Sequence, residues 1–316
     1  MNTPIAWPGI IRISEMSYTI GIDIGGTDIK CICVEAADVD TIERRSSPSV
    51  DALQSDGKPG WFHEVQKIVS LIEEERGASA TGIGISAPGI GAPDESCIAL
   101  MINRMEHLTR LNWSEALDRP EGVPVLNDAQ AALLGEHWCG AARGMRNVFM
   151  LTLGTGVGGA AMVDGRMLKG HRGRAGHLGH ISVDYLGAPD ICGTPGSLED
   201  AIGNDTLVAR SEGRFKDTHD LVEALVAGDE VAQEIWARAI RALAAGVASL
   251  VNVLDPEAVV IGGGISKAGD ALFHPLSAEL ATCEWRPFGQ AVPLVPAELG
   301  TWAGACGAAF NVISRA

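Results

Sequence analysis

An acidic residue interrupts an apolar stretch near the start of the chain. Asp23 stands among alternating isoleucines and precedes Gly25, Gly26 and Thr27. Glycine lets backbone N–H groups approach phosphate oxygens without an intervening Cβ, and a threonine hydroxyl adds a donor. A carboxylate in that place can hold Mg²⁺ against a polyphosphate, directly or through water. The stretch predicts a phosphate-binding turn, although an ordinary glycine hairpin has the same pattern.

A second glycine turn follows about 130 residues later and contains Gly154, Thr155 and Gly156. In both turns a strand-like run follows the glycines, whereas a Rossmann turn would open a helix. Two similar hairpins indicate an internal duplication in which each hairpin begins one lobe. A third glycine group ends a strand predicted over 258–266 and comprises Gly262, Gly263 and Gly264.

A polar pair interrupts the apolar segment 123–140. This segment predicts a strand that ends at Leu126, a turn at Asn127 and Asp128, and then a helix. Near a helix start, a carboxylate is favoured both as a cap and by the helix dipole. The same carboxylate could act as a general base that takes a proton from a substrate hydroxyl. Asn127 could donate hydrogen bonds to neighbouring hydroxyls and accept them.

Three histidines lie close together in the segment 170–203. His171, His177 and His180 precede Cys192, which could complete a metal site. Structural zinc requires four good ligands at suitable spacing. The spacing of His177 and His180 with a single cysteine suggests a site but leaves it incomplete.

The elements that must position these residues alternate between strands and helices. A helix is predicted over 60–77, a buried strand over 81–89, and helices over 217–228, 230–254 and 301–316. This alternation indicates the α/β class. A length of 316 residues suits two lobes of roughly 150 residues each.

Composition narrows the function classes. The formal net charge of −16 opposes general nucleic-acid binding, because such a surface repels phosphate backbones. Seven scattered cysteines without a CxxC pair favour a reduced, cytoplasmic protein. The N-terminus lacks the pattern of a signal peptide, and no stretch is expected to approach the roughly 18 apolar residues of a membrane span. We therefore expect neither nucleic acid nor membrane as a partner.

In their order and spacing, seven motifs together resemble the ROK family (repressor, open reading frame, kinase), within the sugar kinase and actin-like ATPase superfamily. They are DIGGT (23–27), GIGISAPG (82–89), VLNDAQAALLGE (125–136), LGTGVGGA (153–160), AGHLGHISV (175–183), CGTPGSLE (192–199) and LDPEAVVIGGGIS (254–266). The resemblance extends from about Thr19 to near the end of the chain. It implies an α/β fold of two ribonuclease H-like lobes with a cleft between them.

The resemblance also implies domain bounds. An N-terminal extension would cover 1–18, the N-terminal lobe 19–128 and the C-terminal lobe 129–300. The closing helix 301–316 would pack back on the first lobe. The likeness of the chain to the family further suggests a homodimer.

The resemblance implies phosphoryl transfer from ATP with Mg²⁺ to a hydroxyl of a sugar or sugar-like polyol. By position, Asp128 matches the catalytic base, while Asp23 is expected to hold Mg²⁺ because of its place before the first glycine turn. The two glycine hairpins match the phosphate contacts, and the stretch at Gly262–Gly264 is similar to the one that receives adenosine. Asn127, His180 and Glu199 match sugar contacts by position, and Asn103 and His177 are also expected to bind the substrate.

Four positions, 28, 177, 190 and 197, depart from the family pattern. His177 stands where the family has glutamate, and a neutral imidazole cannot accept two hydrogen bonds as a carboxylate does. Asp190 and Ser197 replace two zinc-binding cysteines, so only His180 and Cys192 of that site remain. We therefore expect no tightly bound zinc.

Without zinc, His180 must be oriented by another group, such as a backbone carbonyl or Asp190. The altered sugar pocket makes a substrate other than glucose plausible, for example a different sugar or a cyclitol. Asp28 follows Thr27 where a lysine is common in the family, and no role follows for it from the sequence.

Two other functions compete with the kinase. A catalytically silent sugar-binding protein would explain His177 and the altered zinc loop, but the intact Asp23, Thr27, Asp128 and Thr155 oppose it. A sugar-responsive repressor would carry a helix-turn-helix domain before the first hairpin, and only 18 residues precede Thr19. Polyphosphate remains an alternative phosphoryl donor to ATP.

Overall fold

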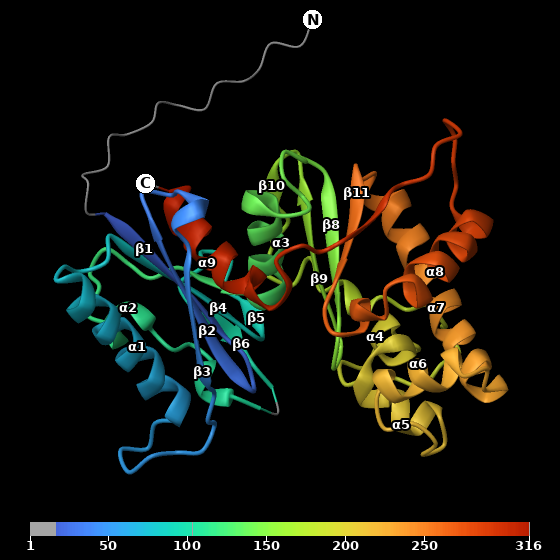
Figure 1. Ribbon diagram of the computed structural model, residues 1–316, viewed down its shortest axis with the longest axis horizontal. Helices are drawn as coiled ribbons and strands as arrows, with labels where there is room; N and C mark the ends of the chain where they lie inside the picture. The colour runs from blue at the N-terminus through green and yellow to red at the C-terminus, as the bar shows by residue number, and fades with distance from the viewer. Residues whose placement is uncertain (1–16, 103, 316) are drawn as a thin grey trace, which may run out of the picture.

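A computed structural model describes residues 17–102 and 104–315 of the chain. Two five-stranded sheets lie side by side and helices pack around both of them (Figure 1). The central strands have the alternating or continuously apolar sequences of a buried sheet, whereas the edge strand β3 is polar and largely exposed. The α/β class predicted from the sequence is confirmed.

The first sheet has the strand order β3-β2-β1-β4-β7. The strands are β1 (Tyr18–Ile24), β2 (Asp28–Glu35), β3 (Glu43–Pro48), β4 (Gly82–Ala87) and β7 (Val125–Asn127). β1 to β3 form an antiparallel meander, and β4 and β7 continue the sheet in parallel with β1. A separate two-stranded sheet joins β5 (Ile90–Gly91) to β6 (Ile98–Leu100).

The second sheet repeats this pattern in the order β10-β9-β8-β11-β12. Its strands are β8 (Val148–Leu153), β9 (Val157–Val163), β10 (Arg166–Met167), β11 (Ala258–Gly262) and β12 (Leu294–Pro296). Again the first three strands are antiparallel and the last two run parallel with the central one. The shared topology agrees with the predicted duplication.

The helices and their bounds are α1 (Gly60–Arg76), α2 (Trp113–Ala116), α3 (Asp128–Cys139), α4 (Leu198–Ile202), α5 (Leu207–Arg210), α6 (Thr218–Val226), α7 (Glu230–Leu254), α8 (Asp270–Cys283) and α9 (Ala303–Ile313). Short 3₁₀ turns lie at 39–41, 106–108, 178–180, 204–206, 265–268 and 300–302.

The C-terminal helix α9 packs against β1, β4 and α3. Glycines permit this close approach. A Cβ on Gly84 would stand 2.0 Å from the carbonyl oxygen of Ala308, and a Cβ on Gly307 only 1.7 Å from that of Ala131. Larger residues at these crossings would force the helices apart, so α9 is fixed between the first sheet and α3.

Several predicted bounds need correction. Tyr18, assigned to the extension, is the first residue of β1 and is buried. β7 continues to Asn127, so Asp128 is the first residue of α3 and not part of a turn. The helix α8, with a proline at position 275, was not predicted.

The long helix α7 also qualifies an expectation about membranes. By length and composition it is long and apolar enough to span a bilayer, which the sequence analysis did not expect of any stretch. Half of its most apolar window is buried within the protein, as in a core helix. Ile240, Leu243 and Val247 belong to the same hydrophobic core as Phe149 and Leu151 of β8.

Candidate active site

Asp128 begins α3 at the end of β7. The Asn127 side chain caps the helix by accepting hydrogen bonds from the backbone N–H groups of Ala129 at 3.0 Å and Gln130 at 3.3 Å. The carboxylate of Asp128 accepts from Ala129 N at 2.8 Å and from Asn127 Nδ2 at 2.9 Å. These contacts give Asp128 a defined orientation and leave one carboxylate oxygen without a hydrogen bond from the described residues.

The surroundings of Asp128 make it more basic than an ordinary aspartate. Desolvation by the surrounding protein raises its pKa, against the hydrogen bond from Ala129 N–H and the positive charge of Arg104. The residue is nevertheless exposed to solvent, which limits the size of this effect. A carboxylate that is accessible and more basic than usual suits proton transfer from a hydroxyl.

Asp23 lies on β1, within the electrostatic reach of Asp128. Burial raises the pKa of Asp23 to about 6, the Ser86 hydroxyl opposes the shift by donating a hydrogen bond at 2.6 Å, and the negative charge of Asp128 adds to it. A Cβ on Gly304 of α9 would stand 2.6 Å from the Asp23 carboxyl carbon, so only glycine fits there. Two neighbouring carboxylates form an oxygen-rich pair that suits a hard cation such as Mg²⁺.

The first hairpin turn is exposed between β1 and β2. Gly25 N–H donates to the carbonyl of Asp28 at 2.9 Å, which closes the turn, while Gly26 and Thr27 are open to solvent. The hairpin's own lysine, Lys30, lies 3.8 Å from the carboxylate of Asp28. The turn therefore presents unshielded backbone next to Asp23, as a phosphate site requires.

The second hairpin turn is fixed by Glu199. The backbone N–H of Val157 donates to Glu199 Oε2 at 2.8 Å. A Cβ on Gly156 would stand 2.2 Å from the same oxygen, so the carboxylate fits against the glycine backbone. Asn204 N–H and Asp205 N–H hold the opposite side of the turn through the carbonyls of Gly154 and Thr155, both at 3.0 Å. Glu199, a predicted sugar contact, thus touches the second glycine turn, a predicted phosphate contact.

The third glycine group begins at the last residue of β11, Gly262, and its second member, Gly263, touches the end of β8. Gly263 has φ +88°, and a Cβ there would stand 2.2 Å from the carbonyl oxygen of Leu153. Gly264 has open space around it. The structure therefore brings the second and third glycine groups together at the same edge of the second sheet.

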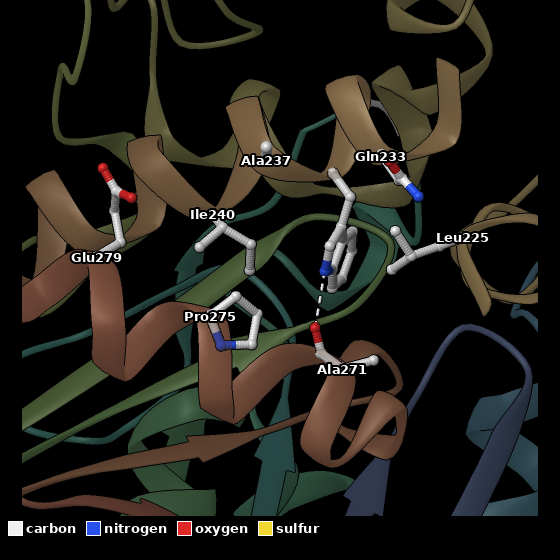
Figure 2. Close-up of a pocket in the computed structure, with 8 residues that line it drawn as sticks. Leu225, Gln233, Ala237, Ile240, Ala271, Pro275 and Glu279 are labelled. Atoms are coloured by element: carbon white, nitrogen blue, oxygen red, sulfur yellow. Dashed lines mark hydrogen bonds between the residues drawn. The ribbon is translucent and has the colours of Figure 1, made fainter. Parts of the chain in front are cut away.

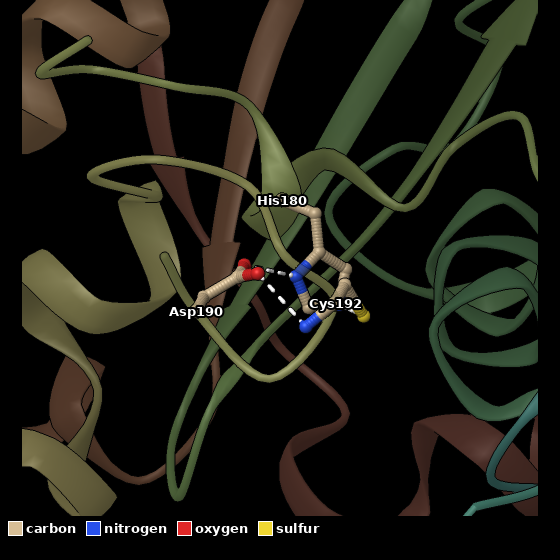
Figure 3. A group of neighbouring side chains, drawn as sticks. All are labelled: His180, Asp190 and Cys192. Atoms are coloured by element: carbon tan, nitrogen blue, oxygen red, sulfur yellow. Dashed lines mark hydrogen bonds and ion pairs between the residues drawn. The ribbon is translucent and has the colours of Figure 1, made fainter. Parts of the chain in front are cut away.

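His180, Asp190 and Cys192 form a cluster whose potential ligand atoms all lie within 4.8 Å of one another (Figure 3). His180 Nδ1 donates to Asp190 Oδ2 at 2.8 Å, and Nε2 lies 3.6 Å from the sulfur of Cys192. The suggestion that Asp190 orients His180 is confirmed. Asp190 also accepts from the backbone N–H groups of Cys192 and Thr194, each at 2.8 Å.

This cluster fits zinc poorly. The cluster offers at most three ligand atoms, and the Asp190 carboxylate among them already accepts three hydrogen bonds. Ser197 is fully buried and its hydroxyl accepts from Asp200 N–H at 3.2 Å to cap α4. Three ligands are too few for a closed structural zinc site, which needs four.

His177 is half-buried beside His180, while His171 is exposed. Burial lowers the pKa of His177, and the positive charge that His180 can carry lowers it further. Its Nε2 atom is buried and has no hydrogen-bond partner among the described residues. A neutral imidazole with an unused nitrogen can form a hydrogen bond to a hydroxyl of a ligand. Asn103, the remaining predicted sugar contact, lies outside the described residues.

A cavity elsewhere in the molecule contains none of the predicted site residues (Figure 2). It has a volume of about 320 Å³ between α7 and α8, with Leu225, Ile240 and Pro275 in its wall. Trp236 Nε1 donates to the carbonyl of Ala271 at 2.8 Å across the two helices. Its mainly apolar wall offers no pair of carboxylates or glycine turn for phosphoryl transfer.

Comparison with known proteins settles the family. The sequence profile of the ROK family matches residues 19–315. The chain belongs to the ROK family. It is 32% identical to a glucokinase of Thermotoga maritima over 94% of this chain and 97% of the relative. It is also 31% identical to an N-acetylmannosamine kinase of Vibrio cholerae over 93% of this chain and 98% of the relative.

Solved structures of the family confirm the predicted two-lobe fold. A ROK glucokinase of Streptomyces griseus in complex with glucose and AMPPNP has a TM-score of 0.74 and 28% sequence identity. The match covers 93% of this chain and 99% of that structure. The two sheets of Figure 1 are the centres of the two lobes of this ROK fold.

The sequence analysis missed two residues beside the site. Ser86 is polar and fully buried in β4, a signal that it bonds a partner, here Asp23. Arg104 approaches the first hairpin from a loop, and sequence periodicity gives no information on where an exposed loop arginine points.

Proposed function

We propose that the protein transfers the γ-phosphoryl group of ATP to a hydroxyl of a sugar or sugar-like polyol. Its membership of a family with glucokinases and an N-acetylmannosamine kinase supports the reaction class. The observation that carries the proposal is the position of Asp128, an accessible carboxylate of raised pKa near Asp23 and the first glycine hairpin.

In this reaction Asp128 accepts the proton of the attacking hydroxyl. Asn127 holds the carboxylate of Asp128 from one side, and Ala129 N–H holds it from the helix start. Asp23 would hold Mg²⁺, which supplies charge neutralisation to the phosphates when bound. The two glycine hairpins offer backbone N–H groups to the phosphates, and Gly262–Gly264 would border the adenosine.

The acceptor binds beside His177, His180 and Glu199 in this proposal. Glu199 reaches the second hairpin through Val157 N–H, so acceptor and phosphate contacts are mechanically linked. The unused His177 nitrogen replaces a carboxylate acceptor of the family, which favours an acceptor other than glucose. Closure of the lobe 19–128 on the lobe 129–300 would exclude water, which competes with the acceptor for the phosphoryl group.

The test is an ADP-release assay over hexoses, N-acylhexosamines and cyclitols, with polyphosphate as a second donor and Asp128→Asn as the control. Turnover that needs an acceptor and Asp128 supports the proposal. Calorimetric binding of an acceptor without any ADP release would instead indicate the silent sugar-binding protein.

Further properties belong to the same proposal. We expect a homodimer in the cytoplasm, with neither nucleic acid nor membrane as partner and no tightly bound zinc. Light scattering checks the dimer, and metal analysis of the purified protein checks the zinc. One zinc per chain would overturn the account of the His180 cluster.

A further inference from the structure

Arg104 projects from a loop that is fastened on both sides. The loop follows β6, and Met101 N–H donates to Thr109 Oγ1 at 3.0 Å. Met105 N–H donates to Asp51 Oδ2 at 3.2 Å. Met105 is buried and has φ +48°, an uncommon conformation for a residue other than glycine. Such a conformation persists only where the surrounding contacts impose it.

Asp51 connects this loop to a rigid part of the first lobe. Its other carboxylate oxygen accepts from Trp61 Nε1 at 2.9 Å. Trp61 is fully buried at the start of α1 and packs 6.2 Å, between ring centroids, from Trp113. The backbone next to Arg104 is therefore anchored to the aromatic core of the lobe.

The guanidinium group of Arg104 lies beside the first hairpin and within electrostatic reach of the proposed base. Its Nη1 atom lies 3.9 Å from the position that a Cβ on Gly26 would occupy. Its positive charge also acts on the carboxylate of Asp128. Arg104 is exposed and forms no ion pair with the aspartates and glutamates that the structure describes, whereas Lys30 of the hairpin is close to Asp28.

We propose that Arg104 contacts the transferring phosphoryl group and stabilises its charge in the transition state. This inference rests on the proposed kinase function. The acceptor oxygen forms a bond to the γ-phosphorus while the bond from that phosphorus to the bridging oxygen of ADP breaks. The hydroxyl proton passes to Asp128, and ADP leaves with the electron pair. A planar guanidinium can donate to two equatorial oxygens at once.

Kinetics of Arg104→Ala, Arg104→Lys and the control Arg110→Ala test the proposal. Arg110 is exposed on the same segment. Arg104→Ala should lower kcat by roughly 10²- to 10³-fold, the usual cost of losing one transition-state donor, with acceptor affinity by calorimetry within twofold. The lysine variant should recover part of kcat, because it restores the positive charge but not the paired N–H donors of the guanidinium group. Arg110→Ala should stay within twofold of wild type.

The pH profile separates this role from a merely structural one. At saturating Mg²⁺, which keeps Asp23 ionised to lower pH, loss of Arg104 should move the acidic limb of the kcat profile to higher pH, because Asp128 loses a positive neighbour, and Arg104→Lys should move it back. Asp51→Asn should lower kcat, and combining it with Arg104→Ala should cost little more than Arg104→Ala alone. Circular dichroism checks that each variant folds.

Two results would overturn the proposal. One is Arg104→Ala with kcat within threefold of wild type. The other is a loss confined to the KM of the acceptor, which would place Arg104 against the acceptor instead. An inactive wild-type protein over the whole acceptor panel would instead refute the kinase function itself, so the two failures are distinguishable.

Discussion

The two hairpins have the same place in their sheets but different surroundings. The last paired residues are Ile24 and Ile29 in the first and Leu153 and Val157 in the second. Four residues therefore lie between them in the first turn, 25–28, and three in the second, 154–156. One residue before these pairs, Asp23 of the first hairpin corresponds to Thr152 of the second.

This difference indicates that the two hairpins have the same fold but different roles. The first turn is open, with a carboxylate of raised pKa at its base and an arginine facing it. The second turn is clamped by Glu199 on one side and by the backbone at 204–205 on the other. We infer that the first hairpin contributes charge to the reaction, whereas the second holds phosphate and acceptor contacts in register.

The largest effect on turnover should come from replacing Asp23, the charged residue at the base of the first hairpin. Asp23→Asn keeps a side-chain oxygen that can accept from Ser86 but removes the charge that we propose holds Mg²⁺, so kcat should fall by roughly 10²-fold or more. Thr152→Val at the equivalent position should stay within about threefold, and steady-state kinetics over a Mg²⁺ titration compares them. If kcat falls equally in both variants, or if Asp23→Asn turns over normally at limiting Mg²⁺, the two hairpins do not have different roles.

The clamp on the second turn predicts a smaller effect, on binding. Gly156→Ala would displace the Glu199 carboxylate, because its Cβ would stand 2.2 Å from Oε2. Losing a charge-assisted hydrogen bond should raise the KM of the acceptor by about tenfold. Gly154→Ala is the control, since nothing lies within 4 Å of its Cβ position. If the two alanine variants have the same acceptor KM, Glu199 does not link the turn to the acceptor.

The pH dependence tests the carboxylate of the open turn. Because the pKa of Asp23 is raised to about 6, its carboxylate is protonated as the pH falls through that value. Activity at limiting Mg²⁺ should therefore be present above pH 6 and decline below it. Saturating Mg²⁺ favours the ionised form and should move the midpoint to lower pH. If the midpoint of the acidic limb does not change with the Mg²⁺ concentration, Asp23 does not hold the metal.

The smallest predicted effect concerns acceptor preference. His177→Glu replaces a neutral imidazole by a carboxylate that accepts two hydrogen bonds, so the ratio of kcat/KM for glucose to that for the best acceptor should rise about tenfold. His171→Glu, at an exposed histidine of the same segment, is the control. Glucose as the best substrate of the wild-type protein would contradict the role assigned to His177.

Much of the fold and part of the site followed from sequence patterns. Strand alternation and glycine turns predicted both hairpins, and the two sheets have the repeated topology that they implied. Local sequence could also place Asp128 at a helix start, because capping depends on neighbouring residues. The order and spacing of the motifs, through their resemblance to the ROK family, predicted that Asp128 and the two hairpins belong to one site.

Contacts between distant segments were not predictable in this way. Ser86 meets Asp23 only because β4 pairs with β1, and Glu199 meets Val157 through a segment some forty residues downstream. Arg104 depends on a strained loop held by Asp51, for which no periodic signal exists. The helix α8 was missed since Pro275 lies inside it and suggests a break.

The central claim is that Asp128 is the base of an ATP-dependent transfer to a sugar hydroxyl, and Asp128→Asn tests it most directly. ADP release on the best acceptor should be measured beside calorimetric binding of that acceptor. Because asparagine keeps the shape but cannot take the proton, turnover should fall by roughly 10²-fold or more, while acceptor binding largely survives. Near-normal turnover in Asp128→Asn would contradict the account.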